Sequence, residues 1–299
     1  MKHFSITCLF FAVALAGCSP GKKNLPEKEE WIQLFNKKDL SGWDIKIAKH
    51  PLNDNFNNNF YVKDSILKID YSAFQKFDGE FGHLYYKEPF SYYKVRVEYR
   101  FNGQQLQGGP DYAWLNSGVM LHSQPASSLG INQTFPVSLE MQLLGSDEKQ
   151  KRTNGNLCTP GTQVNMKGSL VNSHCINSSS KNNMADEWVT AEAVVLGDSV
   201  IYHIINADTV LTYEKPRVGG GFVNNDLTWT RGGFGADSLS WMQKQGAALT
   251  SGYIALQAES HPLEFRKVEL LNLEGCMDKS ALNYKSYFIK ADNSKCKYK

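Results

Sequence analysis

The sequence predicts an all-β protein folded as a β-sandwich. Short runs in which apolar and polar residues alternate recur between turns rich in glycine, asparagine and aspartate, whereas helical periodicity is nearly absent. The clearest run spans residues 93–101, where odd-numbered positions are aliphatic or aromatic and even-numbered positions are charged. Such alternation buries one face of a strand and leaves the other in water. Roughly 270 residues follow the N-terminal leader, enough for one large β domain.

The N-terminal segment predicts an exported, lipid-anchored protein. An apolar run over residues 4–16 is too short to span a bilayer and is typical of a secretory signal peptide. Residues 15–18 read Leu-Ala-Gly-Cys, which resembles the bacterial lipobox. The resemblance implies a lipoprotein signal peptide over residues 1–17, lipidation of Cys18, a tether over residues 18–29 and an anchor in the cell envelope. Ser19 favours the outer membrane, facing the periplasm or the cell surface; a signal peptide cut elsewhere is the alternative.

The charge balance argues against a nucleic-acid partner. The chain has 32 basic and 30 acidic residues, a formal net charge of +2, and no basic patch in the sequence. Nothing in the sequence specifies an oligomeric state.

Two neighbouring runs place polar groups together on one predicted sheet face. In residues 138–144, Glu140 and Gln142 alternate with apolar residues, and in residues 116–122 the same period puts Asn116 and His122 on one face. If the two strands pair, these side chains line one polar patch and form a candidate site. The alternative is an ordinary solvated sheet face.

The predicted closing strands repeat this pattern. Across residues 252–266, Gln257 and Glu259 share a face with Tyr253, while Ile254 and Leu256 alternate into the core. The predicted site therefore draws on segments that lie far apart in the sequence.

The glycine-rich loop over residues 104–114 leads directly into the first polar run. It ends in Trp114, whose ring either stacks on a sugar or packs beneath the loop.

Two cysteines follow in an irregular insertion that is expected to cover the polar face. In an exported chain Cys158 and Cys175 are expected to form a disulfide, which contributes about 3 kcal/mol by loop entropy. A metal pair with His174 is the alternative, although no CxxC spacing accompanies it.

Two motifs resemble a known family. Residues 34–43, LFNKKDLSGW, are similar to the LFNGKDLSGW opening of the bacterial DUF1080 family, the 3-keto-disaccharide hydrolases, with Lys37 in place of glycine. The family's closing signature is matched by the Leu-Gln pair at 256–257, the acid-and-histidine turn at 259–261 and Phe-Arg at 265–266, although Lys267 stands where asparagine is common. The resemblance covers residues 30–274. It implies a concanavalin-like jelly roll with the site on its concave face, and an enzyme that cleaves glycosidic bonds in 3-keto-glycosides.

The chemistry that the resemblance implies requires a base near C2, a positive or donating group at the C3 oxygen and an acid at the leaving oxygen. The candidate bases are Glu140 and His261, and Glu259 is the candidate acid. Arg266, or a divalent cation held by His122 and Glu140, is expected to stabilise the enolate.

The remaining polar side chains are expected to bind the carbohydrate. Asn116, His122, Gln142 and Gln257 would contact hydroxyl groups, and Trp114 a sugar ring. The alternatives are an ordinary two-carboxylate glycoside hydrolase and a non-catalytic, lectin-like module.

The last 25 residues form a separate predicted element. Residues 275–299 are similar to small "GCxDxxAxNY…DxxxC" modules at the ends of exported proteins, and this resemblance implies a disulfide between Cys276 and Cys296. Lys285 and Lys290 reduce the acidity that a calcium site would need.

Overall fold

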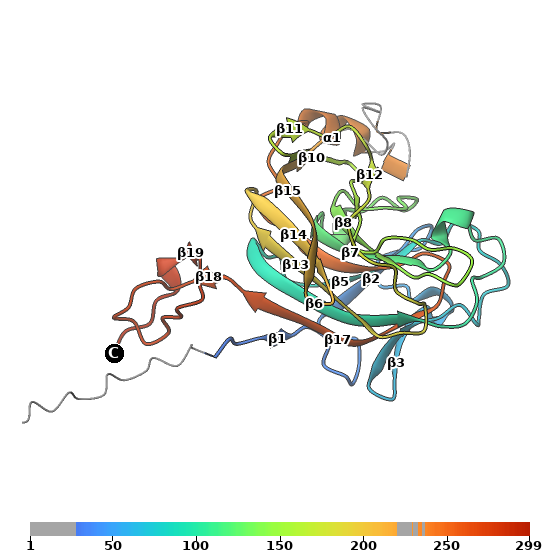
Figure 1. Cartoon of the computed structure of the whole chain (residues 1–299), viewed down its shortest axis with the longest axis horizontal. Coiled ribbons are helices and arrows are strands. Elements are labelled where there is room, and N and C mark those ends of the chain that lie inside the picture. The colour runs from blue at the N-terminus through green and yellow to red at the C-terminus, as the bar shows by residue number, and fades with distance from the viewer. Residues whose placement is uncertain (1–27, 220–228, 230–232, 235–236) are drawn as a thin grey trace, which may run out of the picture.

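The computed structural model describes residues 28–219, 229, 233–234 and 237–299, and it shows a two-layered β-sandwich of the jelly-roll type (Figure 1). The predicted signal peptide, Cys18 and the tether up to residue 27 lie outside the described residues. The predicted all-β class is confirmed, since only short helices accompany the strands in the described part of the chain.

One layer is a ten-stranded sheet in the order β11-β10-β15-β14-β13-β6-β17-β4-β3, with β1 paired to β17. Its strands are β1 (Ile32–Gln33), β3 (Phe60–Lys63), β4 (Ile66–Ile69), β6 (Tyr92–Phe101), β10 (Thr162–Met166), β11 (Ser169–Leu170), β13 (Val189–Leu196), β14 (Val200–Ile205), β15 (Asp208–Val218) and β17 (Leu263–Asn272).

The other layer is a seven-stranded sheet in the order β12-β9-β8-β7-β16-β5-β2. Its strands are β2 (Trp43–Ile47), β5 (Gly82–Tyr86), β7 (Asn116–Ser123), β8 (Leu139–Leu144), β9 (Leu157–Cys158), β12 (Cys175–Ile176) and β16 (Tyr253–Ala258). All described strand pairs in the two layers are antiparallel.

The core lies between the two layers and follows the predicted alternation. In β6 every second residue from Tyr93 to Phe101 is buried, and in β8 Leu139, Met141 and Leu143 join the same core cluster. Strand β16 contributes Ile254, Leu256 and Ala258 from the same side of its sheet. Burial of these side chains, at about 25 cal/mol per Å² of apolar surface, fixes which residues of β8 and β16 must face away from the core.

The outer face of the ten-stranded sheet carries ion pairs. Arg96 bonds to Glu192 and, at 2.8 Å, to Glu269, and Arg100 donates to Glu264 at 2.8 Å. Glu192 therefore belongs to this outer face.

The turn over residues 36–43 has the conformation that its sequence requires. The Asn36 side chain accepts from the backbone N–H groups of Lys38 and Asp39, and Trp43 Nε1 donates to the Leu34 carbonyl at 2.9 Å. Lys37 has φ of 64°, a left-handed conformation that favours glycine. The substitution at this family position therefore acts on the turn.

Helical structure is confined to short segments. They are α1 (Ser238–Gln243) and the 3-10 turns η1 (Phe56–Asn58), η2 (Asp111–Ala113), η3 (Ala126–Ser128) and η5 (Asn293–Lys295). Across the described ranges, no helix combines the length and the apolar character needed to cross a membrane.

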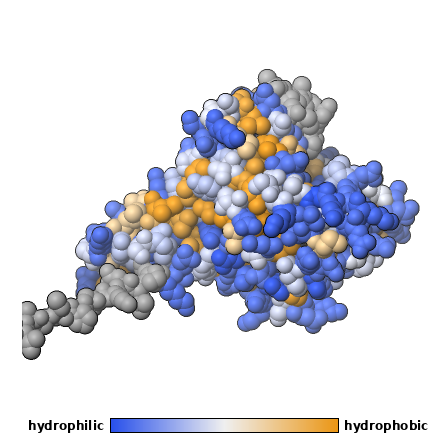
Figure 2. Space-filling model, in the orientation of Figure 1, coloured by the Kyte–Doolittle hydropathy of each residue, from blue (hydrophilic) through white to orange (hydrophobic). Residues whose placement is uncertain are grey.

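The C-terminal tail, residues 275–299, is closed by the expected Cys276–Cys296 disulfide. At the base of the tail, β18 (Glu274–Gly275) and β19 (Lys290–Ala291) pair as two short parallel strands. Lys285 forms an ion pair with Glu30, so the tail lies beside the start of the domain (Figure 1). Apolar side chains reach the surface in a band that extends from the sandwich toward the tail (Figure 2).

The tail's two aspartates are engaged by its own side chains. Asp278 accepts from Ser280 and from Tyr298, and Asp292 accepts from Ser294 and pairs with Lys295. These bonds occupy the carboxylate oxygens that a calcium ion would use.

Candidate active site

The candidate site is a cavity of about 700 Å³ over the outer face of the seven-stranded sheet. Its floor comes from β7, β8, β9 and the residue after β16, and its walls come from η2, β12 and the segment around residues 151–156. The volume suits a ligand of one or two sugar rings.

Four predicted polar residues meet in this cavity. Glu140 and Gln142 project from β8, Asn116 projects from β7, and Glu259 follows the end of β16. Strands β7 and β8 pair as expected, with Asn116 opposite Leu144 and Met120 opposite Glu140. The two carboxylates, 119 positions apart in the sequence, therefore face the same space.

A glycine makes room for Glu140. Gly118 pairs with Gln142, and a methyl group on Gly118 would lie 2.8 Å from both Cγ and Oε1 of Glu140. Such a contact is far inside van der Waals distance, so the Glu140 side chain lies across the sheet where only glycine leaves space.

Burial sets the protonation of the carboxylate pair. It raises the pKa of Glu140 to about 8, and the pKa of Glu259 is held well above the usual value, first by burial and then by the charge of Glu140. Burial, with the same two charges, raises the pKa of Tyr112 to about 12 at the edge of the cavity. Near neutral pH the Glu140 carboxyl group is therefore largely protonated, and it ionises as the pH approaches 8.

Arg152 also lines the cavity. Its Nη2 donates to the carbonyl oxygens of Trp114 (2.6 Å), Leu115 (2.8 Å) and Gly145 (3.0 Å). Its positive charge lowers the pKa of Glu259 and of His261, although burial is the larger influence on each.

The prediction that His122 shares the polar face is wrong. Two residues of β7, Leu121 and His122, lie opposite the single residue Ile254, because the pairing register shifts there, and His122 takes φ of 48°. This bulge turns the ring away from the cavity. His122 Nε2 lies 3.1 Å from the Gly197 carbonyl, and its ring packs edge-on against Tyr93.

The same bulge removes the predicted metal pair. Glu140 lines the cavity, whereas His122 Nε2 contacts the Gly197 carbonyl on the opposite side of the sheet, so one ion cannot bind both side chains. These two residues do not fit a shared divalent cation.

The expectation that Arg266 stabilises an enolate in the site is also wrong. It is the extra residue at a register shift in β17, between Phe265 and Lys267. On the outer face of the ten-stranded sheet it pairs with Glu98 at 2.6 Å and covers the Trp188 ring. It cannot contact a ligand in the cavity.

Trp114 and Gln257 lie near the cavity without lining it. The Trp114 ring packs on the core and stacks with Arg152, so the interpretation that it packs beneath the loop is the one that holds. Gln257 is completely buried next to His83 on β5, and both of its amide atoms lack a hydrogen-bond partner in the described structure.

His261 is buried against Phe101 and does not line the cavity. Burial, and then the charge of Arg152, lowers the pKa of His261 to about 4, so its ring is neutral. Of the two candidate bases, Glu140 lines the cavity and His261 does not.

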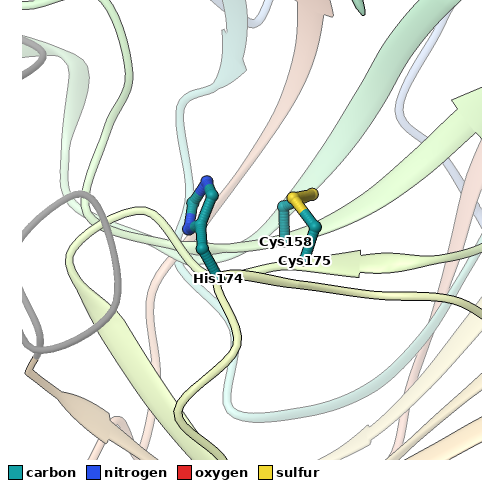
Figure 3. A group of neighbouring side chains, drawn as sticks. All are labelled: Cys158, His174 and Cys175. Atoms are coloured by element: carbon teal, nitrogen blue, oxygen red, sulfur yellow. A yellow bond between two sulfur atoms is a disulfide. The ribbon is translucent and has the colours of Figure 1, made fainter.

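The expected Cys158–Cys175 disulfide forms part of the cavity wall, with the His174 ring beside it (Figure 3). Cys158 pairs with Cys175 on one side and with Glu140 on the other. Ligand atoms of Cys158, Cys175 and His174 lie within 4.8 Å of one another, but both sulfurs are bonded in the disulfide. They are not thiolates, so the zinc-type alternative does not fit.

Sequence reasoning missed the residues that come from irregular segments. Tyr112, Phe135, Arg152 and Asn156 all line the cavity, yet none lies in an alternating run. The available signal was indirect: an insertion expected to cover the face must contribute side chains to it.

The fold and the site together define a class: a jelly-roll sandwich with a buried carboxylate pair in a sugar-sized cavity, which is a carbohydrate-active protein. The chain belongs to the family described as the 3-keto-alpha-glucoside-1,2-lyase-like domain, whose sequence profile matches residues 30–271. No curated protein matches the chain.

Solved structures with similar architecture are distant. A candidate glycosyl hydrolase from Parabacteroides distasonis ATCC 8503 is 16% identical, with 82% of this chain and 100% of that one covered and a TM-score of 0.46. A variant of LamA from Z. galactanivorans, in complex with laminaritriose and laminaritetraose, is 12% identical over 81% and 97%, with a TM-score of 0.43. A Bacillus subtilis protein of unknown function with a galectin-like fold is 10% identical over 82% and 97%, with a TM-score of 0.44.

Proposed function

We propose that the protein cleaves the glycosidic bond of 3-keto-glycosides, including 3-keto-disaccharides, by deprotonation at C2 and elimination of the C1 aglycone. The family membership supports this reaction. The observation that carries the proposal is the convergence of Glu140 and Glu259 in one buried cavity, where burial raises the pKa of both.

Each carboxyl group has one part in the reaction. The ionised Glu140 carboxylate takes the C2 proton, and the electron pair of the C2–H bond forms a C2–C3 double bond while the C3 carbonyl becomes an enolate. The carbonyl then re-forms, the electron pair moves to C1–C2, and the C1–O bond breaks as Glu259 gives its proton to the leaving oxygen. The products are an unsaturated 3-keto-sugar and the free aglycone, and later addition of water at C1 gives net hydrolysis.

The cavity supplies the environment that this sequence needs. A C2 proton beside a ketone is acidic enough for a carboxylate with a pKa of about 8 to remove, because base strength rises with pKa. Burial and the negative charge of an ionised Glu140 both raise the pKa of Glu259, so Glu259 tends to keep its proton when Glu140 has lost its own. Asn116 and Gln142 offer amide groups to the sugar hydroxyls.

The decisive experiment compares a 3-keto-glucoside with its unoxidised parent. We expect aglycone release from the keto-sugar alone; release from the parent at a comparable rate would reject elimination in favour of a two-carboxylate hydrolase. Glu140→Gln should abolish turnover and keep binding, whereas Glu148→Gln, on an exposed loop, should match the wild type. Product analysis separates lyase from hydrolase activity, and a lectin-like module would bind without any turnover.

We also propose that Cys18 is lipidated and anchors the enzyme in the cell envelope, at the outer membrane. The support is the lipobox-like sequence at residues 15–18. Cys18→Ala should move the protein from the membrane fraction to the soluble fraction of the exporting cell; an unchanged distribution would reject the anchor.

A further inference from the structure

The elimination develops negative charge on the C3 oxygen, and the site needs a group that receives it. Arg266, which was expected for this role, and His122, which was expected to hold a cation for it, face other parts of the molecule. Two side chains with permanent positive charge line the cavity, Lys151 and Arg152. Lys151 is exposed to water, whereas Arg152 is partly buried, so the field of Arg152 is the less screened of the two.

Arg152 is held in place by neutral acceptors. Its Nε and Nη2 donate to carbonyl oxygens of two separate segments, at Trp114 and Leu115 before β7 and at Gly145 after β8. Its guanidinium carbon lies 5.2 Å from the centroid of the Trp114 ring. Packing and hydrogen bonds thus fix the planar group without neutralising its charge.

The charge of Arg152 remains available to a ligand. Within the described ranges no carboxylate forms an ion pair with it, and its hydrogen bonds use Nε and Nη2 and leave Nη1. The ionisable groups that act on it are Tyr99, Asp147 and Glu259. Its own effect on the pKa of Glu259 and His261 shows that its field reaches the acid of the proposed mechanism.

We propose that Arg152 is a further catalytic residue, which donates from its guanidinium to the C3 oxygen and stabilises the enolate formed when Glu140 removes the C2 proton. This assignment rests on the proposed function. It places the electrophile on the wall of the cavity and the base and the acid on the floor, on β8 and after β16. The guanidinium is fixed before the substrate arrives, so it needs no reorganisation as the charge develops.

The competing explanation is that Arg152 only joins two loops. Exchange of the C2 hydrogen separates the two, because enolate formation needs no leaving group. In D₂O, the wild type should exchange the C2 proton of a methyl 3-keto-glucoside, followed by NMR. Glu259→Gln should slow aglycone release while leaving exchange near the wild-type rate, whereas Arg152→Gln should slow both by about 10²–10³-fold, the usual loss for one oxyanion donor. Lys149→Gln, which removes an exposed positive charge outside the cavity, should stay within about twofold of the wild type.

The outcomes distinguish a failure of the proposed function from a failure of the role of Arg152. A wild type that neither exchanges nor releases aglycone rejects the proposed function and this role with it. An active wild type with unchanged C2 exchange in a folded Arg152→Gln variant rejects the role of Arg152 alone. If Arg152→Gln does not fold, Arg152→Lys is assayed in the same way. Lysine keeps the positive charge but lacks the planar guanidinium with its fixed pair of donors. C2 exchange at the wild-type rate in that variant would also reject the assignment.

Discussion

Replacing Glu140 by glutamine should stabilise the protein, and the gain should depend on pH. The Glu140 carboxyl is buried and its pKa is raised from 4.5 to about 8. The folded protein thus binds this proton more tightly than the unfolded chain does. The stability that the proton contributes is complete below pH 4.5 and is lost as the pH rises towards 8. Glutamine has nearly the same shape and no proton to lose, so the variant escapes this loss.

The size of the effect follows from the shift. Each pH unit above 4.5 costs the wild type about 1.4 kcal/mol relative to the variant, until the pH reaches about 8. At pH 7 the difference amounts to about 3 kcal/mol in the free energy of unfolding, which corresponds to a rise in Tm of roughly 5–10 °C. Near pH 4.5 the two proteins should have nearly equal stability.

The assay is urea unfolding of both proteins at several pH values between 4.5 and 8, with Glu148→Gln as the exposed control. The difference in the free energy of unfolding, plotted against pH, should rise with a slope of about 1.4 kcal/mol per unit. A constant offset across this range, or a less stable Glu140→Gln at pH 7, would show that the carboxyl is not held protonated by burial.

Three further predictions concern activity and the cavity wall. The value of kcat/KM on a 3-keto-glucoside should increase about tenfold per pH unit below pH 8, as Glu140 ionises, and fall at higher pH where Glu259 loses its proton; a flat profile from pH 6 to 8 would exclude Glu140 as the base. Cys175→Ser, which opens the Cys158–Cys175 disulfide, should cost about 3 kcal/mol of stability and reduce activity, measured by unfolding and turnover; unchanged values would show that the wall is rigid without it. Arg266→Gln should leave kcat within about twofold and cost about 1 kcal/mol, because it breaks an exposed ion pair and a surface contact with the Trp188 ring. A tenfold loss of kcat would contradict its placement.

Much of the fold was predictable because alternation in β6, β8 and β16 directly reports which side is buried. The same rule placed Glu140 and Glu259 on one face, since each lies an even number of residues from a polar neighbour on its own segment. It failed at His122, because a bulge inserts one residue and reverses the orientation argument at that point. Arg266 was expected to act on the enolate without an alternation argument, and it lies on the other sheet, on its outer face.

Other features of the site had no periodic signal at all. Arg152 reaches the cavity from a segment without alternation, and its position depends on carbonyl groups of two other segments. Long-range hydrogen bonds of this kind are set by the tertiary arrangement, which local sequence does not encode. The disulfides were the exception. Cys158 and Cys175 were expected to pair within one insertion, and the resemblance of the tail to small two-cysteine modules implied the Cys276–Cys296 bond.

Because the Glu140 side chain lies against Gly118, the residues at these two positions are expected to be kept or lost together in evolution. Any side chain at 118, even a methyl group, takes the volume that the Glu140 carboxyl occupies. In a homologue with another residue at this position, the glutamate must be absent or its side chain must lie elsewhere. A search for relatives with the same chemistry can therefore require both residues together. A glycine at position 118 therefore indicates that a carboxyl group can occupy the position of Glu140.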